Sequence, residues 1–414
     1  MKTLLILGGF PQMIDIVFTA REMGIKTIVV DINENSPAKK FSDKAFNINT
    51  TDIPKLVEIC GEEKVDGVFT GFEDFNIHIA CELCEELGLP FYATKNQLEY
   101  ITNKLSFKQK CREYGIPVIE QYSLESAIKL NRYPYIIKPA DSYGSRGITV
   151  CRNERELNKG YERAVKISKT KTAVIEKFVD YPYGTELFYT AVDGELYLTA
   201  TADRYTVKNG ETTVPLPVAE VFPSRQRNKM VDELDLKIRK MLKGMGIQNG
   251  LILIQSLFDG SEFFIYEMAY RFTGEQHYRL VLKQQGINLA KMMIKCALGE
   301  DISEYKTEKI SDEYFVFPSI NLALILNPGK ISYISGLEKV YKINEVISYN
   351  LTHYDNDVIK PSGDYSHMLI RINMVAKDYK ELCRAVKEVD DFVSVTSDNG
   401  EDMLSAHFNL SEES

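Results

Sequence analysis

The sequence lacks the features that mark secreted, membrane-spanning and disulfide-stabilised proteins. Its seven cysteines are scattered over 414 residues, and a chain of this length does not depend on a disulfide framework. Cys81 and Cys84 form a CxxC pair, but no second pair exists, which favours packing over zinc or redox chemistry. No apolar run approaches a membrane span, and the start MKTLLILGGF is too short to be a signal peptide. We therefore expect a reduced, soluble, cytoplasmic protein without a membrane partner.

The usual dinucleotide-binding motif is also missing. Gly8 and Gly9 follow the first apolar strand and Asp31 ends the second, as in a dinucleotide-binding fold. The residues FPQ then stand where a GxGxxG loop would continue. We therefore interpret residues 1–95, which alternate short strands with helices, as a small doubly wound α/β scaffold domain.

The charge balance excludes another class of partners. A net charge of −9 and an isoelectric point near 5.4 argue against a general nucleic-acid surface or an anionic-membrane surface. A local basic site for a phosphorylated ligand remains compatible with this charge. The hydrophobic content of 44% and charged content of 26% are ordinary for a soluble globular protein. The length allows two or three domains.

What is present centres on the stretch from Gly250 to Gly274. It predicts two apolar strands around a turn at Asp259-Gly260, interrupted by the polar side chains Gln255, Glu267 and Arg271. The register depends on the loop: two residues would put Gln255 and Glu267 on opposite faces, whereas three or five would put them on the same face. A five-residue loop would set them directly opposite each other. Such a cluster suits Mg²⁺ and phosphate; the alternative is an edge hairpin with one exposed ion pair.

Other polar residues interrupt the region from residue 96 to residue 311. A helix is predicted over residues 96–115, with a break after Thr102-Asn103 that would place Lys104 near exposed backbone donors. Lys138 ends an apolar strand and precedes a glycine-rich loop, residues 141–147, which lacks P-loop spacing but can wrap phosphates. Glu176 and Glu186 interrupt apolar strands, although surface exposure is the default for both. Residues 312–414 return to strands and predict a mostly β domain.

Taken together and in this order, these stretches resemble the ATP-grasp superfamily across nearly the whole chain. The nearest likeness is to single-chain carboxylate–amine ligases of the L-amino-acid-ligase type, and the text is also similar to half of the carbamoyl phosphate synthetase large chain and to biotin carboxylase. The segments that carry the resemblance are LLILGGFPQ, NKLSFKQKCREYG, IIKPADSYGSRGI, AVIEKFV and IYEMAYRFTGEQ. The resemblance implies an N-terminal domain (1–95), an ATP-grasp domain (96–311) with a lid at about 115–182, and a C-terminal domain (312–414).

The resemblance also implies roles for individual residues. Lys104 and Lys138 contact the ATP phosphates, and the loop that contains Ser142 and Ser145 folds over them. Mg²⁺ (or Mn²⁺) is held by Gln255 and Glu267, and the transferred phosphoryl group meets Lys138 and Arg271 as the catalytic residues. The adenine hinge comprises Glu176, Lys177 and Val179, with Glu186 on the ribose hydroxyls.

One position departs from the family. Ala269 stands where an asparagine usually supplies a third metal ligand, so water or phosphate would have to fill that place. We expect the alanine to face the cleft and to leave room for an asparagine. Arg204, His277 and Arg279 fall near the expected cleft and could bind a substrate carboxylate, although structural ion pairs or exposed side chains are equally expected.

The implied function is an ATP-dependent ligase that joins a carboxylate to an amine through an acylphosphate and releases ADP and phosphate. The expected partners are small molecules, with a homodimer left open. Two alternatives remain: a carboxylase-like enzyme that uses bicarbonate, and a non-catalytic ATP-binding sensor. The alanine at position 269, in place of the usual asparagine, is the reason to consider the sensor.

Overall fold

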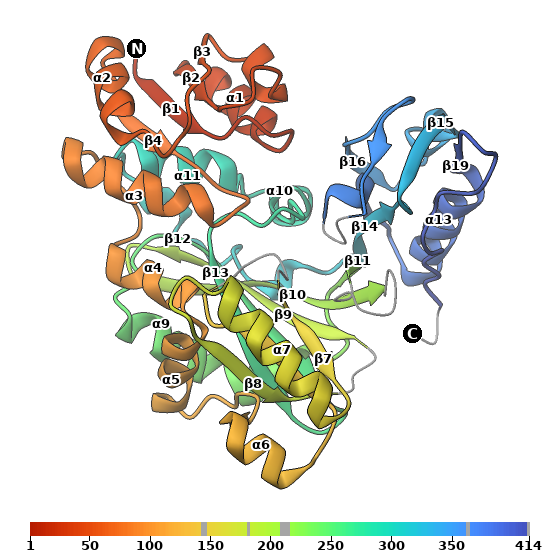
Figure 1. Ribbon diagram of the computed structural model, residues 1–414. Coiled ribbons are helices and arrows are strands. Elements are labelled where there is room, and N and C mark those ends of the chain that lie inside the picture. Colours follow the sequence, from red (N-terminus) through yellow and green to blue (C-terminus); the bar gives the residue numbers. More distant parts are fainter. Residues whose placement is uncertain (142–146, 180–182, 208–215, 362–364, 412–414) are drawn as a thin grey trace.

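The computed structural model describes the whole chain except residues 142–146, 180–182, 208–215, 362–364 and 412–414. It has three lobes: an N-terminal α/β domain, a central region of two antiparallel sheets, and a C-terminal lobe (Figure 1). The predicted multidomain α/β and α+β class is therefore confirmed. All seven cysteines are free thiols. Within the described residues, no helix is both long and apolar enough to cross a membrane.

The N-terminal domain is a parallel sheet with helices on both faces. Successive side chains of a strand point to opposite faces, so Leu4 and Ile6 pack on the side of α1 while Leu5 and Leu7 pack on the side of α2 and α3. The strands, in the order β3-β2-β1-β4, and the helices are β1 (Thr3–Leu7), β2 (Lys26–Val30), β3 (Lys44–Phe46), β4 (Gly67–Phe69), α1 (Met13–Glu22), α2 (Ile53–Glu63) and α3 (Phe75–Leu87).

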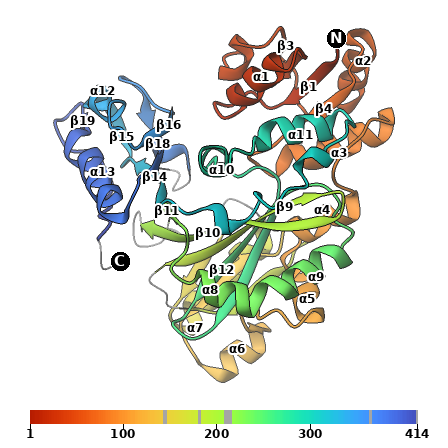
Figure 2. The same ribbon diagram turned by 180° about the vertical axis from the view of Figure 1, so that it is seen from behind.

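The central region is built on an eight-stranded antiparallel sheet. One face carries α10 (Tyr278–Gln285) and α11 (Leu289–Ala297), which lie between the sheet and the N-terminal domain (Figure 1). The other face carries α4 (Lys95–Thr102), α5 (Lys104–Glu113) and α9 (Leu236–Gly244). Figure 2 shows α8 (Arg227–Met230) beside α9 from behind. The strand order is β13 (Phe263–Tyr270), β12 (Gly250–Phe258), β9 (Gly184–Val192), β10 (Glu195–Val207), β11 (Leu216–Phe222), β14 (Ser319–Ile325), β18 (Met368–Val375) and β16 (Val346–Leu351).

A smaller antiparallel sheet lies within the segment predicted as the lid. Its order is β5 (Gln121–Tyr122), β8 (Ala173–Lys177), β6 (Tyr135–Pro139) and β7 (Thr149–Cys151). Helices α6 (Leu124–Leu130) and α7 (Glu154–Ile167) pack against it. The main chain of Ile265 on β13 donates to Pro117 O, so this small sheet is tied to the large one.

The C-terminal lobe contributes strands to the large sheet and also forms a small three-stranded sheet of its own. Strands β14, β16 and β18 all lie within residues 312–414 and continue the sheet begun by β9 to β13, so the sheet crosses the predicted boundary at residue 312. The remaining elements of the lobe are β15 (Gly329–Ser335), β17 (Val358–Ile359), β19 (Ser394–Ser397), α12 (Leu337–Val340) and α13 (Tyr379–Phe392). The apolar face of α13 packs into their common core.

Candidate active site

The β12–β13 hairpin places Gln255 directly opposite Glu267. The loop that does so is not the five-residue one that the sequence suggested, because Phe258 pairs with Phe263 and leaves residues 259–262 as the loop. The pairing shifts between Gln255 and Ser256, so Tyr266 is an extra residue on β13. This bulge restores the alignment of the two predicted metal ligands.

Strand pairing and the alternation of side chains extend this polar pair across the large sheet. Residues that pair directly share one face, as do residues two apart on a strand. Gln255 also pairs with Glu186, which in turn pairs with Ala202 on β10. Arg204, two residues after Ala202, pairs with Glu220, which pairs with Asn321, and Asn321 pairs with Asn373. We call these side chains the polar row; it comprises Glu267, Gln255, Glu186, Arg204, Glu220, Asn321 and Asn373. The row lies on the face of the sheet that also packs against α10, since Phe188, two residues after Glu186, stacks on His277.

Two lysines share one buried carboxylate beside this hairpin. Lys138 Nζ lies 2.9 Å from Glu176 Oε2, and Lys108 Nζ pairs with Glu176 Oε1. Lys108 and Glu176 are each only 1% exposed, so the default expectation of an exposed Glu176 is wrong. Burial, together with the nearby charge of Lys104, lowers the pKa of Lys138 to about 8. Burial and the Lys138 charge also lower the pKa of Lys108 well below its usual value. Where both lysines are protonated, two ammonium groups on one carboxylate leave a net positive charge, which suits a phosphate.

The predicted break in the first helix of this region is real. Helix α4 (Lys95–Thr102) ends and α5 (Lys104–Glu113) begins at once, with the Asn103 side chain accepting from Leu105 N and Ser106 N. Lys104 and Lys108 are four residues apart on α5 and therefore share a face. The predicted phosphate-loop residues Ser142 and Ser145 lie outside the described residues.

The hinge residues lie beside an apolar cluster. Val179 packs with Ile119 and Leu257, and Phe264 and Tyr266 lie against this cluster between the two sheets. An apolar cluster between two sheets suits a planar base. The main-chain N–H of Lys177 is donated to Glu120 O, so the amide group of this residue already has a partner.

The predicted metal ligands are two side-chain groups, the amide oxygen of Gln255 and the carboxylate of Glu267. Gln255 Nε2 donates to Glu186 Oε1 at 2.7 Å, which leaves the Gln255 carbonyl oxygen for another partner. The described residues contain no cluster of three or more histidine, cysteine, aspartate or glutamate side chains that could hold a metal ion. A pair of oxygens fits Mg²⁺, which commonly keeps several waters and binds through one or two protein groups plus phosphates.

Glu186 is a buried member of the polar row. Its Oε1 lies 3.5 Å from Arg204 Nε and accepts a hydrogen bond from Gln255 Nε2. The role of Glu186 on the ribose hydroxyls stays a prediction. Burial raises the pKa of both Glu186 and Glu220. The neighbouring carboxyl groups of Glu186 and Glu275 raise the pKa of Glu220 further.

Tyr266, the bulge residue, joins the lysines to the polar row. Its ring lies under the Lys138 ammonium group, 5.5 Å from the ring centre, and its hydroxyl lies 3.5 Å from Arg204 Nη1. Bulges often re-aim a side chain at a functional site, and here the bulge turns Tyr266 toward both basic groups.

A further carboxylate, Glu275, lies among arginines. Burial acts to raise its pKa, but the guanidinium groups of Arg371, Arg204 and Arg271 outweigh burial and hold that pKa below its usual value. Asn321 supports both sides of this arrangement, since it donates to Glu275 O and accepts from Arg371.

Arg271, predicted to meet the phosphoryl group, is held by the N-terminal domain. Its Nε and Nη2 donate to the two carboxylate oxygens of Asp74 at 2.5 and 3.0 Å. This two-point contact fixes the plane of the guanidinium group. The Asp74 carboxylate also holds the pKa of Arg271 above its usual value, so Arg271 stays charged.

The three predicted substrate residues lie in different environments. Arg204 is part of the polar row. His277 is buried, its Nδ1 lies 3.0 Å from Thr273 Oγ1, and burial lowers its pKa to about 4, so it is neutral near pH 7. Arg279 pairs with Asp15 on α1. Of the three, only Arg204 is placed beside the other candidate residues as a charged group.

Ala269 does not face open space, contrary to the expectation from the sequence. It is 8% exposed and lies in the apolar core that contains Leu253 and Phe272. The alternation of β13 does put it on the face of Glu267, but α10 and the N-terminal domain cover that part of the face. An asparagine there would have to displace apolar side chains.

Sequence reasoning missed Lys108, Glu220, Glu275 and Arg371. A signal existed for two of them: Lys108 stands four residues after Lys104, and Arg371 interrupts the otherwise apolar strand text HMLIRINMV. A charged residue in a buried strand needs a partner, and that requirement could have marked Arg371.

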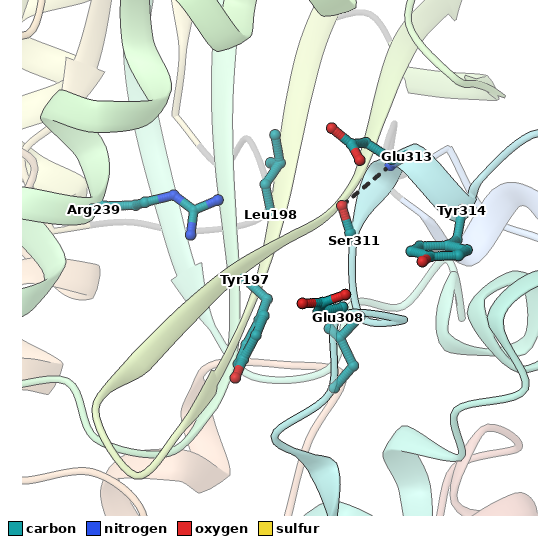
Figure 3. A pocket seen from close by; sticks show the side chains of 8 residues that line it. Tyr197, Leu198, Arg239, Glu308, Ser311, Glu313 and Tyr314 are labelled. Atoms are coloured by element: carbon teal, nitrogen blue, oxygen red, sulfur yellow. Dashed lines mark hydrogen bonds between the residues drawn. The ribbon is translucent and has the colours of Figure 1, made fainter.

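A separate pocket of about 310 Å³ opens on the α9 side of the sheet (Figure 3). Its lining includes Leu198 of β10, which packs in the core of that face, and Arg239, which is already engaged by Asp235. None of the side chains that line it belongs to the polar row. We therefore do not place the active site there.

The fold and these residues define the class of the central domain, which is an ATP-grasp domain. Residues 103–305 match the family model described as "Carbamoyl-phosphate synthase L chain, ATP binding domain", and residues 4–88 match "PylC-like, N-terminal domain". The resemblance inferred from the sequence is confirmed.

Similar proteins include both ligases and carboxylases. The chain is 26% identical over 226 residues to a formate-dependent phosphoribosylglycinamide formyltransferase of Ignicoccus hospitalis, which covers 52% of either chain. It spans about half or less of the length of the curated relatives it matches. Among solved structures, an L-amino acid ligase from Bacillus licheniformis shares the fold with a TM-score of 0.79 at 19% identity, over 96% of this chain and 99% of that one.

A second solved structure of similar fold contains bound ligands. The biotin carboxylase domain of a 2-oxoglutarate carboxylase from Hydrogenobacter thermophilus, solved with MgADP and bicarbonate, has a TM-score of 0.75 at 19% identity. The alignment covers 97% of this chain and 91% of that chain. At these identities, both structures establish the shared fold.

Proposed function

We propose that the chain is an ATP-dependent ligase that joins a carboxylate to an amine through an acylphosphate, releasing ADP and phosphate. The observation that carries the proposal is the polar row, in which Gln255 and Glu267 lie in register with the buried carboxyl group of Glu186 and on the same face of the sheet as Arg204. The shared positive charge of Lys138 and Lys108 lies beside the same hairpin. The likeness to an L-amino acid ligase supports it.

The residues have separable tasks in this proposal. Lys104 and Lys138 bind the nucleotide phosphates, and the apolar cluster around Val179 receives the adenine. Mg²⁺ or Mn²⁺, held by Gln255 and Glu267, would neutralise phosphate charge when bound. Arg271, Arg204 and Arg371 offset the negative charge of the substrate carboxylate and of the phosphoryl group as it is transferred. No protein nucleophile is needed, since positioning and charge stabilisation suffice.

An activated carboxylate hydrolyses readily, which explains why the site is enclosed. Burial of Lys138, Glu176 and Glu186 indicates a site with little water at its base. We propose that the lid at about 115–182 closes over ATP. A cytoplasmic location and a homodimer are part of the same proposal.

ADP release measured over a panel of substrates tests the function. We expect ATP and Mg²⁺ to give ADP with an amino-acid carboxylate, at a rate that an amine raises. Lys138→Met should reduce kcat about 100-fold or more because it removes a charge from the moving phosphoryl group. Lys110→Met, at the surface of α5, is the control and should keep full activity.

The same panel separates the alternatives. ADP release with bicarbonate alone would favour a carboxylase-like enzyme. We consider this alternative because the chain shares its fold with a biotin carboxylase domain. ATP binding without ADP release under any condition would favour a nucleotide sensor.

A further inference from the structure

The bulge on β13 turns two consecutive side chains toward the same face of the large sheet. Neighbouring side chains of a regular strand point to opposite faces, so Tyr266 would point away from the face that carries Glu267. Instead, Tyr266 packs against the cluster that contains Leu257, which is two residues after Gln255 and therefore on the polar-row face. Ile265 lies in the core of the opposite face. The extra residue thus places a tyrosine beside the polar row without removing Glu267 from it.

The hydroxyl group of Tyr266 contacts the arginine of the polar row. Arg204 Nη1 donates to this hydroxyl oxygen at 3.5 Å, and Arg204 Nε lies 3.5 Å from Glu186 Oε1. Strands β12 and β9 lie between β13 and β10, so the main chains of the two residues are about 14 Å apart across the sheet. Two long side chains that extend toward each other span this distance. A guanidinium group with contacts at two of its nitrogens has a fixed plane.

The ring of Tyr266 contacts a lysine of the predicted phosphate site. Lys138 Nζ lies 5.5 Å from the centre of the ring and 2.9 Å from Glu176 Oε2. An ammonium group over the face of an aromatic ring is attracted to it, and the attraction is stronger where water is excluded. Lys138 is buried, with 8% of its surface exposed. The ring and the Glu176 carboxylate therefore both hold the Lys138 ammonium group in place.

We propose that Tyr266 is a positioning residue that links the ATP half of the site to the substrate half. Its ring holds Lys138, which is assigned to the ATP phosphates, and its hydroxyl group orients Arg204, which is assigned to the substrate carboxylate. The inference rests on the proposed ligase function and deepens it. The γ-phosphate has to meet the carboxylate in a fixed geometry, and one side chain that contacts both basic groups sets their separation.

Two substitutions separate the hydroxyl group of Tyr266 from its ring. Tyr266→Phe keeps the ring and removes the contact with Arg204, so we expect the KM for the substrate carboxylate to rise about tenfold. The Kd for ATP should stay within about twofold of the wild type, because the ring still faces Lys138. Tyr266→Leu also removes the ring and should raise the Kd for ATP about fivefold or more. Calorimetry measures the Kd, and ADP release at varied carboxylate concentration measures the KM.

Double-mutant cycles show whether these effects pass through Arg204 and Lys138. Substitutions of two residues that act through one contact are not additive. In an Arg204→Met background, Tyr266→Phe should therefore raise the KM no further. In a Lys138→Met background, Tyr266→Leu should raise the Kd for ATP no further. A tyrosine that only packs against the apolar cluster would keep its full effect in both backgrounds, and that result would overturn the proposal.

Tyr197→Phe is the matched control, since it removes one hydroxyl contact, with Glu195 at 2.6 Å, outside the polar row. It should leave both constants unchanged. If Tyr266→Leu does not fold, Tyr266→Met, whose flexible side chain fills irregular gaps, replaces it with the same expected loss. A Tyr266→Phe protein with the wild-type KM would also overturn the proposal. A wild type that releases no ADP with any substrate would contradict the ligase function, whereas the ATP affinities need no turnover and still decide the contact with Lys138.

Discussion

At the scale of single residues, the site depends on burying two lysine side chains with a single glutamate. Glu176 alone would neutralise Lys138 and compete with a phosphate for it. Lys108 weakens that competition, because its Nζ engages the second oxygen of the Glu176 carboxylate. Lys108 is therefore a positioning residue that keeps Lys138 available.

Lys108→Met should weaken ATP binding selectively. Without the Lys108 charge, Glu176 pairs with Lys138 alone, so we expect the Kd for ATP to rise about tenfold, or about 1.4 kcal/mol. The affinity for adenosine, which has no phosphate, should change less than about twofold. Calorimetry with both ligands measures the ratio, with Lys110→Met as the surface control. An equal loss for ATP and adenosine would mean that the variant only disturbs the fold.

The protonation of Lys138 predicts how ATP binding depends on pH. The ammonium group is charged below its pKa, and burial lowers that pKa to about 8. ATP affinity should therefore be full below this pH and fall as the pH rises through it. Lys138→Arg keeps its charge to much higher pH and should flatten the profile. Parallel decline in both proteins would assign the pH effect to another group.

At the scale of elements, register decides which side chains meet. The bulge at Tyr266 aligns Gln255 with Glu267, and strand pairing carries the polar row from β13 to β18. The existence of these strands could be predicted from their apolar sequences. The register could not, because it depends on pairings between segments far apart in the chain. For the same reason Glu220 and Arg371 were not singled out.

The break between α4 and α5 offers a test at this scale. The Asn103 side chain accepts from Leu105 N and Ser106 N at the start of α5. Asn103→Ala should lower the free energy of unfolding by about 1 kcal/mol, because these donors lose their cap. Asn103→Asp retains an acceptor and should stay within about 0.3 kcal/mol of the wild type. Urea denaturation of the three proteins decides; equal stability of all three would show that the cap contributes nothing.

At the scale of the whole molecule, the N-terminal domain completes the site. It supplies Asp74, which fixes Arg271, and its β4 packs against α11 of the central region. The sequence pattern predicts that this domain is a scaffold, but it does not predict its position against the central region. A local pattern does not show which helix of a later segment covers a sheet. Asp74 was not singled out for that reason.

The packing of β4 on α11 requires a glycine at position 67. A Cβ atom there would overlap the carbonyl oxygen of Ala297, whereas a Cβ at Gly61 in α2 would meet nothing within 4 Å. We expect Gly67→Ala to destabilise the protein by about 1–3 kcal/mol through overpacking. Gly61→Ala should be neutral or stabilise it by up to about 1 kcal/mol as a helix substitution. Thermal melts of both variants measure this difference. A Gly67→Ala protein as stable as the wild type would mean that the two domains do not pack this closely.

The central claim is that the site activates a carboxylate by transferring the γ-phosphate of ATP to it. Isotope transfer measures this directly: the carboxylate that supports turnover is labelled with ¹⁸O, and the released phosphate is analysed by mass spectrometry. An acylphosphate carries one carboxylate oxygen into the phosphate when the amine displaces it. We predict one ¹⁸O atom in each phosphate formed per ligation. Phosphate without label, at a rate of ADP release that matches product formation, would contradict an acylphosphate mechanism at this site.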